Sequence, residues 1–384
     1  MHSKPQMSFM QYFGDLPDPR IDRTKLHPLA NIIVITICAV ICGAQTWEDI
    51  EAYGVDKIAW LHTILPLEYG IPSHDTFSRV FTRINPDMFQ KCFFRWVWAT
   101  SGITSGQVIP IDGKTLRHSY DSSTRNGAIH MISAWASAQR LVIGQVKTAE
   151  KSNEITAIPE LLRLLVINGC IITIDAMGCQ KTIAAQIIDQ EADYVLAVKQ
   201  NQPHLYDDIQ ATFATLLAQE TATDLQSYTT HNYQHGRDEI RTYWTTAQLD
   251  GIRDRDAWKG LKSIGMTLSD REYQGKSHQE IRYFIVSREN DVSTFGHAVR
   301  THWSIENNLH WVLDVAFGED DSRIHKGYAP QNMAVMRHIA LNILQHDQTR
   351  TGSIRTKRLG AGWNDTYLET LLMRMENDNQ LDIK

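Results

Sequence analysis

The chain has 384 residues, a formal net charge of −6 and 42% hydrophobic residues. This length exceeds that of a usual single domain and excludes a small, disulfide-dependent protein. The five cysteines form no CxxC pair, so free thiols and a reducing, cytoplasmic compartment are expected. The longest apolar run, residues 29–44, is interrupted and shorter than the roughly 20 residues that a membrane helix needs, so no membrane contact is predicted.

Residues 1–103 are predicted to form an all-helical accessory domain. Within it, residues 71–79 follow a short turn and suggest a DNA recognition helix, with Arg79 reaching phosphates or bases. An ordinary amphipathic helix that packs Phe77 and Phe81 inward is the alternative, and it is the more usual structure for such a segment.

Residues 106–200 alternate between strands and helices in the order βββαβαβ, which is that of an RNase H-like mixed sheet. The predicted fold class is therefore α/β, preceded by helices. Residues 203–290 lose this alternation and are predicted to form a β-rich insertion with three strands. Its loops are expected to present basic residues beside aromatic ones, a combination suited to a phosphate backbone, with solvated hairpins as the alternative. These basic residues are Arg237, Arg241, Lys276 and Arg282.

Two apolar runs, VIPI at 108–111 and CIITI at 170–174, each lead to an aspartate, Asp112 and Asp175. A glycine follows each aspartate and is predicted to end the strand or the turn after it. If the two strands are neighbours, the carboxylates converge, and their repulsion favours a hard divalent cation between them. The competing interpretation is that each aspartate caps the turn that follows it.

A strong helix is predicted from Thr294 to Phe317. Glu306 stands four residues from both His302 and His310, so one stripe of this helix carries several potential ligands. The two histidines are two turns apart, too far to share one small ion without another element. Glu306 is therefore preferred as a third carboxylate, and three apolar side chains are expected to face partly toward the sheet: Trp303, Leu309 and Trp311.

Long motifs across nearly the whole chain resemble the H-repeat-associated group of bacterial insertion-sequence DDE transposases. They are VIPIDGKTLRHSYD (108–121), GQVKTAEKSNEITAIPEL (144–161), TIDAMGCQK (173–181), HGRDEIR (235–241) and HWSIENNLHWVLDVAFGEDD (302–321), with a similar helical leader. The resemblance implies that Asp112, Asp175 and Glu306 form the DDE triad on an RNase H-like fold. It also implies two-metal phosphoryl transfer with Mg²⁺, for which Mn²⁺ can substitute, on double-stranded DNA at transposon ends and target.

In related transposases a Tyr, an Arg and a Lys flank the glutamate. Here the corresponding positions hold Val299, His302 and Leu313, with Arg300 and Lys326 nearby. The residues that contact DNA are therefore predicted one by one, without the family's pattern. They are Lys114, Arg117, His302, Arg300, Arg79 and Arg237. For Lys114 and Arg117, which follow the first aspartate, the alternative is that their side chains are simply solvated at the surface.

The expected organisation is a helical DNA-binding domain at 1–103, an RNase H-like catalytic domain at 104–347 and a basic helical tail at 348–384. The resemblance implies an insertion-sequence transposase that cleaves and joins DNA as a homo-oligomer on the terminal inverted repeats. Two alternatives remain at this point. One is a catalytically inactive transposon relic that only binds DNA, and the other is a metal-dependent nuclease without strand transfer.

Overall fold

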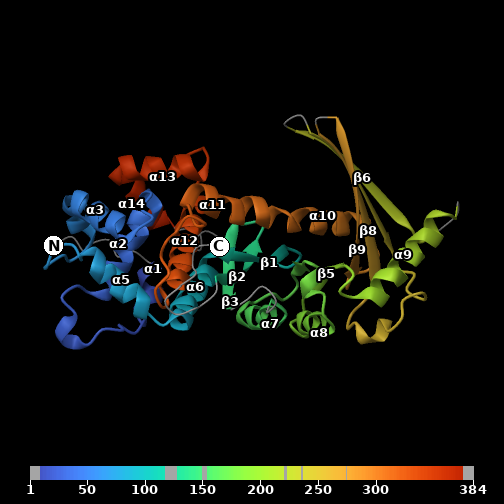
Figure 1. The fold of residues 1–384 in the computed structure, drawn as a ribbon, viewed down its shortest axis with the longest axis horizontal. Helices are drawn as coiled ribbons and strands as arrows, with labels where there is room; N and C mark the ends of the chain where they lie inside the picture. Colours follow the sequence, from blue (N-terminus) through green and yellow to red (C-terminus); the bar gives the residue numbers. More distant parts are fainter. Residues whose placement is uncertain are drawn as a thin grey trace, which may run out of the picture.

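The computed structural model describes residues 9–116, 128–148, 154–219, 223–234, 237–273 and 275–374. Three parts follow one another along the long axis of the molecule: helices from both ends of the sequence, a mixed sheet flanked by helices, and a projecting β-ribbon (Figure 1). The predicted α/β class with a leading helical region is confirmed.

The helices before the sheet pack around one buried helix, α2 (Leu29–Cys42), which ends at Gly43 with a left-handed φ of 122°. The next helix, α3 (Trp47–Asp56), begins with a capping box formed by Thr46 and Asp49. Arg79 is exposed on α5 (His74–Arg83), whose apolar face is buried as the amphipathic interpretation expected. The other helices of this region are α1 (Phe9–Phe13), α4 (Ile58–Ile64) and α6 (Pro86–Thr100).

Within the described residues, no single helix is long and apolar enough to cross a membrane. Helices α2 and α3 satisfy that test only as a pair, across a bend of 96°.

Helices from the C-terminal part of the chain dock on this region. Asn332 of α12 (Ala329–His346) donates to two carbonyls at the end of α5, at 2.8 and 3.0 Å. Arg358 of α13 (Ile354–Trp363) donates to a carbonyl near the end of α2 at 2.7 Å. On α14 (Asp365–Arg374), Asp365 pairs with Lys57 at 2.6 Å. The described part of the predicted C-terminal tail is therefore helical and packed against α2 and its neighbours.

The central sheet has the predicted chain order βββαβαβ. Strand β1 pairs antiparallel with β2 and parallel with β4, β4 pairs parallel with β5, and β3 lies outside β2. The elements are β1 (Val108–Leu116), β2 (Ile129–Ala136), β3 (Leu141–Thr148), α7 (Glu154–Leu164), β4 (Ile171–Ile174), α8 (Lys181–Asp189) and β5 (Asp193–Val198).

The insertion continues this sheet instead of forming a separate layer. Its last strand pairs antiparallel with β5, so the spatial order runs β3-β2-β1-β4-β5-β9-β8-β7-β6. Three strands were predicted here, and the fourth, β6, was missed. The elements are α9 (Pro203–Leu217), β6 (Gln226–Gln234), β7 (Arg237–Thr246), β8 (Ser263–Tyr273) and β9 (Lys276–Val286).

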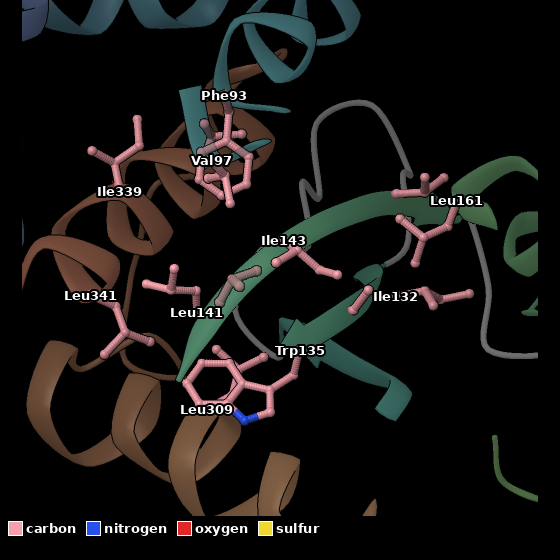
Figure 2. Close-up of a cluster of buried hydrophobic side chains, with 14 of the residues drawn as sticks. Phe93, Val97, Ile132, Trp135, Leu141, Ile143, Leu161, Leu309, Ile339 and Leu341 are labelled. Carbon is pink, nitrogen blue, oxygen red and sulfur yellow. The ribbon is translucent and has the colours of Figure 1, made fainter. Parts of the chain in front are cut away.

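Part of the apolar core lies where α6 and α12 meet β2 and β3 (Figure 2). Beside it, the amide of buried Asn342 on α12 makes two 2.9 Å hydrogen bonds to the backbone N–H and C=O of Val142. This side chain satisfies backbone groups of the edge strand β3, so helix and sheet are joined by polar as well as apolar contacts. The labelled core residues include Phe93, Val97, Trp135, Leu141, Ile143, Ile339 and Leu341.

Candidate active site

The parallel pairing of β1 with β4 brings the two predicted aspartates together. The register sets Ile111 beside Ile174, so Asp112 and Asp175 are the next residues on neighbouring strands. Both side chains line one cavity of about 400 Å³. The convergence that the sequence pattern could only suggest is therefore present in the fold.

Strand β1 does not end at Asp112, contrary to the prediction. It continues through Leu116, paired with β2. A Cβ added at Gly113 would lie 2.4 Å from His130 Nε2 and 2.7 Å from Glu154 Oε1, and these two buried atoms are themselves 2.7 Å apart. Gly113 is thus needed for close packing under the His130–Glu154 pair, and it does not break the strand.

The environments of the two aspartates differ. Burial, followed by the negative charges of Glu154 and Asp112, raises the pKa of Asp175. Burial acts in the same direction on Asp112, but the nearby imidazoles of His310 and His302 hold its pKa below its usual range. Asp175 also accepts a hydrogen bond from the backbone of the following turn at 3.0 Å, so the capping interpretation is correct for this residue. The cap hydrogen bond from the backbone N–H of Met177 is made to one carboxylate oxygen, Oδ1.

Glu306 opens a π-helical turn, Glu306–His310, between α10 (Val292–His302) and α11 (Trp311–Phe317). The predicted helix is therefore present but is not α-helical throughout. Glu306 is exposed and lines the same cavity as Asp112 and Asp175. In the part of the chain that the structure describes, no three His, Cys, Asp or Glu side chains stand close enough to hold a metal ion. The three acids share a cavity without forming a closed set of ligands.

The π-helical turn separates the two histidines that were expected to flank Glu306. His302 lies on the cavity wall, where its Nδ1 is 2.9 Å from the hydroxyl of Thr173. His310 is buried, with its Nε2 3.4 Å from an oxygen of Asp112. Burial lowers the pKa of His302, although Asp112 and Asp175 act against this shift. A neutral imidazole at neutral pH is the consequence.

Of the three apolar side chains predicted to face partly toward the sheet, Leu309 is buried and Trp303 is half-buried on the cavity wall. The prediction is wrong for Trp311, which is 60% exposed.

Lys114 takes part in a buried ion-pair network instead of standing free beside the cavity. Its ammonium contacts Asp314, and it lies 2.8 Å from Glu319, whose other oxygen is 3.6 Å from Arg337. Only 12% of the Lys114 side chain is exposed. A phosphate contact by Lys114 remains a prediction, but it would require these ion pairs to break.

The other predicted DNA contacts are spread over the molecule. Arg300 on α10 is half-exposed and lies 3.6 Å from Glu239 of β7, while Arg79 lies on α5 in the helical region. Arg237 begins β7, but its side chain is not described. Arg117 lies outside the described residues. The structure therefore does not bring this set into one surface.

Two cations that do line the acidic cavity are Arg282 and Lys199. Arg282 was expected on a loop but lies in β9, with its guanidinium 4.2 Å from the ring centroid of Trp303. Lys199 was not predicted as a site residue. Lys199 follows β5 directly, as Asp175 follows β4, and these two strands are parallel neighbours. Because parallel strands end at the same edge of a sheet, the sequence could have predicted Lys199 at this edge.

The sheet and its acids define an α/β protein with an acidic cavity where parallel strands end. Residues 103–343 match the family model described as "Transposase DDE domain", and residues 10–97 match the one described as "DDE_Tnp_1-associated". The chain belongs to the DDE transposase family, and its likeness to the H-repeat-associated group is confirmed.

Two relatives from Escherichia coli match over most of their length. "H repeat-associated putative transposase YhhI" of strain K12 is 44% identical, over 94% of this chain and 97% of its own. "Putative transposase YncI" of O157:H7 is 42% identical, over 95% of this chain and 94% of its own. A solved piggyBac transposase synaptic complex with hairpin DNA is a remote match, with 11% identity and a TM-score of 0.44 over 98% of this chain and 80% of that one.

Proposed function

We propose that the protein is an insertion-sequence transposase that binds the terminal inverted repeats of its element and catalyses Mg²⁺-dependent DNA cleavage and strand transfer. The observation that carries the proposal is the pairing of β1 with β4, which sets Asp112 beside Asp175. Glu306 lines the same cavity, and the whole site belongs to a chain of the DDE transposase family.

Asp112, Asp175 and Glu306 are the residues that would hold the metal. Because they do not form a closed set of ligands in this structure, the exposed Glu306 side chain would have to move toward the two aspartates. All three offer carboxylate oxygens, which suit Mg²⁺ and also Mn²⁺. The raised pKa of Asp175 fits this assignment, because a bound cation would offset the burial and the negative charges that raise it. When bound, the metal supplies activation of the attacking oxygen and stabilisation of the leaving oxygen.

Other side chains on the cavity wall would orient the DNA. Lys199 presents exposed positive charge beside the acids. Arg282, which lies over the ring of Trp303, would exchange its partner Glu280, 2.8 Å away, for a phosphate. His302, held by Thr173 and neutral, would position a DNA end through hydrogen bonding. The helical region at 1–103, with exposed Arg79, would supply further contacts to double-stranded DNA, and the protein would act as a homo-oligomer on the paired ends.

The test is cleavage of DNA carrying the element's own ends, with Mg²⁺, by wild type and by the variants Asp112→Asn and Asp175→Asn. Each neutral amide keeps the size of the side chain but removes metal affinity, so cleavage should be abolished while binding of the ends is retained. Asp256→Asn is the matched control, because the Asp256 side chain is fully exposed and remote from β1 and β4 in the sequence. Near-normal cleavage by either site variant would remove that residue from the catalytic site.

The products of the same assay decide between the alternatives. Joined strands indicate a transposase, and cut strands without joined products indicate a nuclease. Binding of the ends without any metal-dependent cleavage by wild type would indicate an inactive relic.

A further inference from the structure

A second cavity, of about 810 Å³, lies on the other side of the π-helical turn that carries Glu306. Its walls come from the β2–β3 turn with Arg140, from Asn307 and Asn308 of the π-helical turn, from Trp311 and Val315 of α11, and from the start of α13 with Arg355. Glu306 faces the acidic cavity while the next two residues face this one. One turn of helix is therefore the common wall of two cavities.

The apolar surface of this second cavity is unusually open to solvent. Trp311 is 60% exposed and Val315 is 55% exposed, although they belong to a helix whose other face is buried. An indole presented in a groove of this size offers a flat surface for stacking, and the volume lies within the roughly 300–1,000 Å³ of ligand pockets.

The polar lining favours an anionic ligand. Arg140 and Arg355 are both exposed, and neither has a carboxylate partner among the described residues. The acid on the wall, Asp347, is already engaged: it accepts from the Tyr367 hydroxyl at 2.7 Å and lies 3.5 Å from the Lys357 ammonium. Its side chain is 1% exposed. The groove thus combines accessible positive charge with an aromatic face in a chain of negative net charge.

The amides complete a surface suited to nucleobases. Asn307 and Asn308 project from the π-helical turn, and Gln139 on the β2–β3 turn has a buried carbonyl oxygen without a hydrogen-bond partner among the described residues. Amides can donate to and accept from base edges whatever the base. Stacking on Trp311 requires a base whose face is free, which an intact duplex does not provide away from its ends.

We propose that this groove binds an unpaired DNA strand, with a base stacked on Trp311 and phosphates held by Arg140 and Arg355. The inference rests on the proposed function, because the strand would run across the π-helical turn from a phosphate bound at the acids. The shared wall gives the physical link: a strand leaving the acidic cavity past Glu306 meets Asn307, Asn308 and then Trp311.

The test measures binding without chemistry. A fluorescent oligothymidylate and a duplex of mixed sequence are titrated with the full-length protein in EDTA, and anisotropy is read. Trp311→Ala should weaken binding of the single strand by about 5- to 150-fold, which is the range expected for one stacked base, and should change duplex binding little. Trp311→Phe should retain most of the affinity, since it keeps an aromatic face.

Trp363→Ala is the matched control, because Trp363 is a 75% exposed tryptophan of α13 that does not line the groove. Arg140→Ala and Arg355→Ala should each reduce the salt dependence of single-strand binding. Equal effects of Trp311→Ala and Trp363→Ala, or equal loss of single-strand and duplex binding, would overturn the proposal. Thermal unfolding of each variant excludes a general loss of structure.

The outcome is separable from that of the cleavage assay. If wild type cleaves its ends but Trp311→Ala binds the single strand normally, the groove has another occupant and the proposed function stands. If wild type does not cleave but Trp311→Ala loses single-strand binding selectively, the groove assignment stands without the catalytic one.

Discussion

Replacement of Glu319 by glutamine should destabilise the protein strongly. The Glu319 side chain is 2% exposed, and its two oxygens face two buried cations, Lys114 at 2.8 Å and Arg337 at 3.6 Å. Glutamine keeps the shape but removes the charge. Lys114 retains Asp314 as a partner, whereas the Arg337 side chain, 5% exposed, is left without a carboxylate partner among the described residues. Removing one partner of a buried ion pair costs about 3–5 kcal/mol.

Differential scanning fluorimetry and urea unfolding measure this loss. At about 2–4 °C per kcal/mol for a domain of 150–250 residues, the midpoint should fall by roughly 6–20 °C. Glu289→Gln is the control, because Glu289 makes a similar ion pair with Lys262 but is 84% exposed, and such surface pairs contribute about 0–1 kcal/mol. Equal midpoints for Glu319→Gln and Glu289→Gln would refute the reasoning.

The pH dependence of the unfolding free energy independently tests whether the Glu319 charge stabilises the protein. Burial tends to raise the pKa of Glu319, but Lys114 and Arg337 hold it below its ordinary value of 4.5. Because the pKa is lower in the folded state, the ionised carboxylate stabilises the folded protein at pH values above the unfolded-state pKa. This stabilisation is lost as the pH falls through the folded-state pKa. The difference in stability between wild type and Glu319→Gln should therefore be constant near neutrality and should shrink below about pH 4.5. A difference that does not change with pH would indicate a steric effect of the substitution.

Three further predictions concern the site and the packing around it. Because burial and the charges of Glu154 and Asp112 raise the pKa of Asp175, protons should compete with metal at a higher pH than for an ordinary carboxyl. Mn²⁺ affinity measured by electron paramagnetic resonance should therefore fall with decreasing pH before ordinary carboxyls begin to titrate. Glu306→Gln should lose Mg²⁺-dependent cleavage, and Mn²⁺ should partly restore it. His302→Ala should keep metal binding but bind DNA ends more weakly. The reverse pattern would indicate a metal site built on histidines. Asn342→Leu leaves the N–H and C=O of Val142 without partners and should cost about 2–4 kcal/mol in urea unfolding, and an unchanged midpoint would contradict this.

The aspartates could be found from the sequence because an apolar run that ends in an acid is a strong local pattern. What the pattern lacks is the register between strands, which depends on how β1, β4 and their covering helices pack. Gly113 illustrates the limit. A glycine after an acid usually ends a strand, but here its missing Cβ accommodates His130 and Glu154, which come from β2 and α7. No local rule reports a close approach between segments that are distant in sequence.

The π-helical turn and β6 were missed for related reasons. The prediction placed His302, Glu306 and His310 on one stripe because residues four apart share a face of an α-helix. The π-helical turn changes this periodicity, and in the structure Glu306 is exposed whereas His310 is buried. Strand β6, with the sequence QSYTTHNYQ, has no apolar alternation because it is the outermost strand of the ribbon and carries few buried side chains. Its pairing with β7 is a tertiary feature.

The position of Lys114 links the stability of the interior to the geometry of the acidic site. Lys114 lies two residues after Asp112 on β1 and contacts Asp314 on α11, directly beyond the turn that begins with Glu306. The same ammonium therefore fixes the strand of the first acid against the helix of the third. A DNA phosphate could recruit Lys114 only by uncovering Asp314 and Glu319, which would loosen that helix. The cation expected to meet phosphate at the acids is therefore Lys199, which is exposed on the cavity wall, and not Lys114. Arg282 would first have to leave Glu280, from which it lies 2.8 Å away.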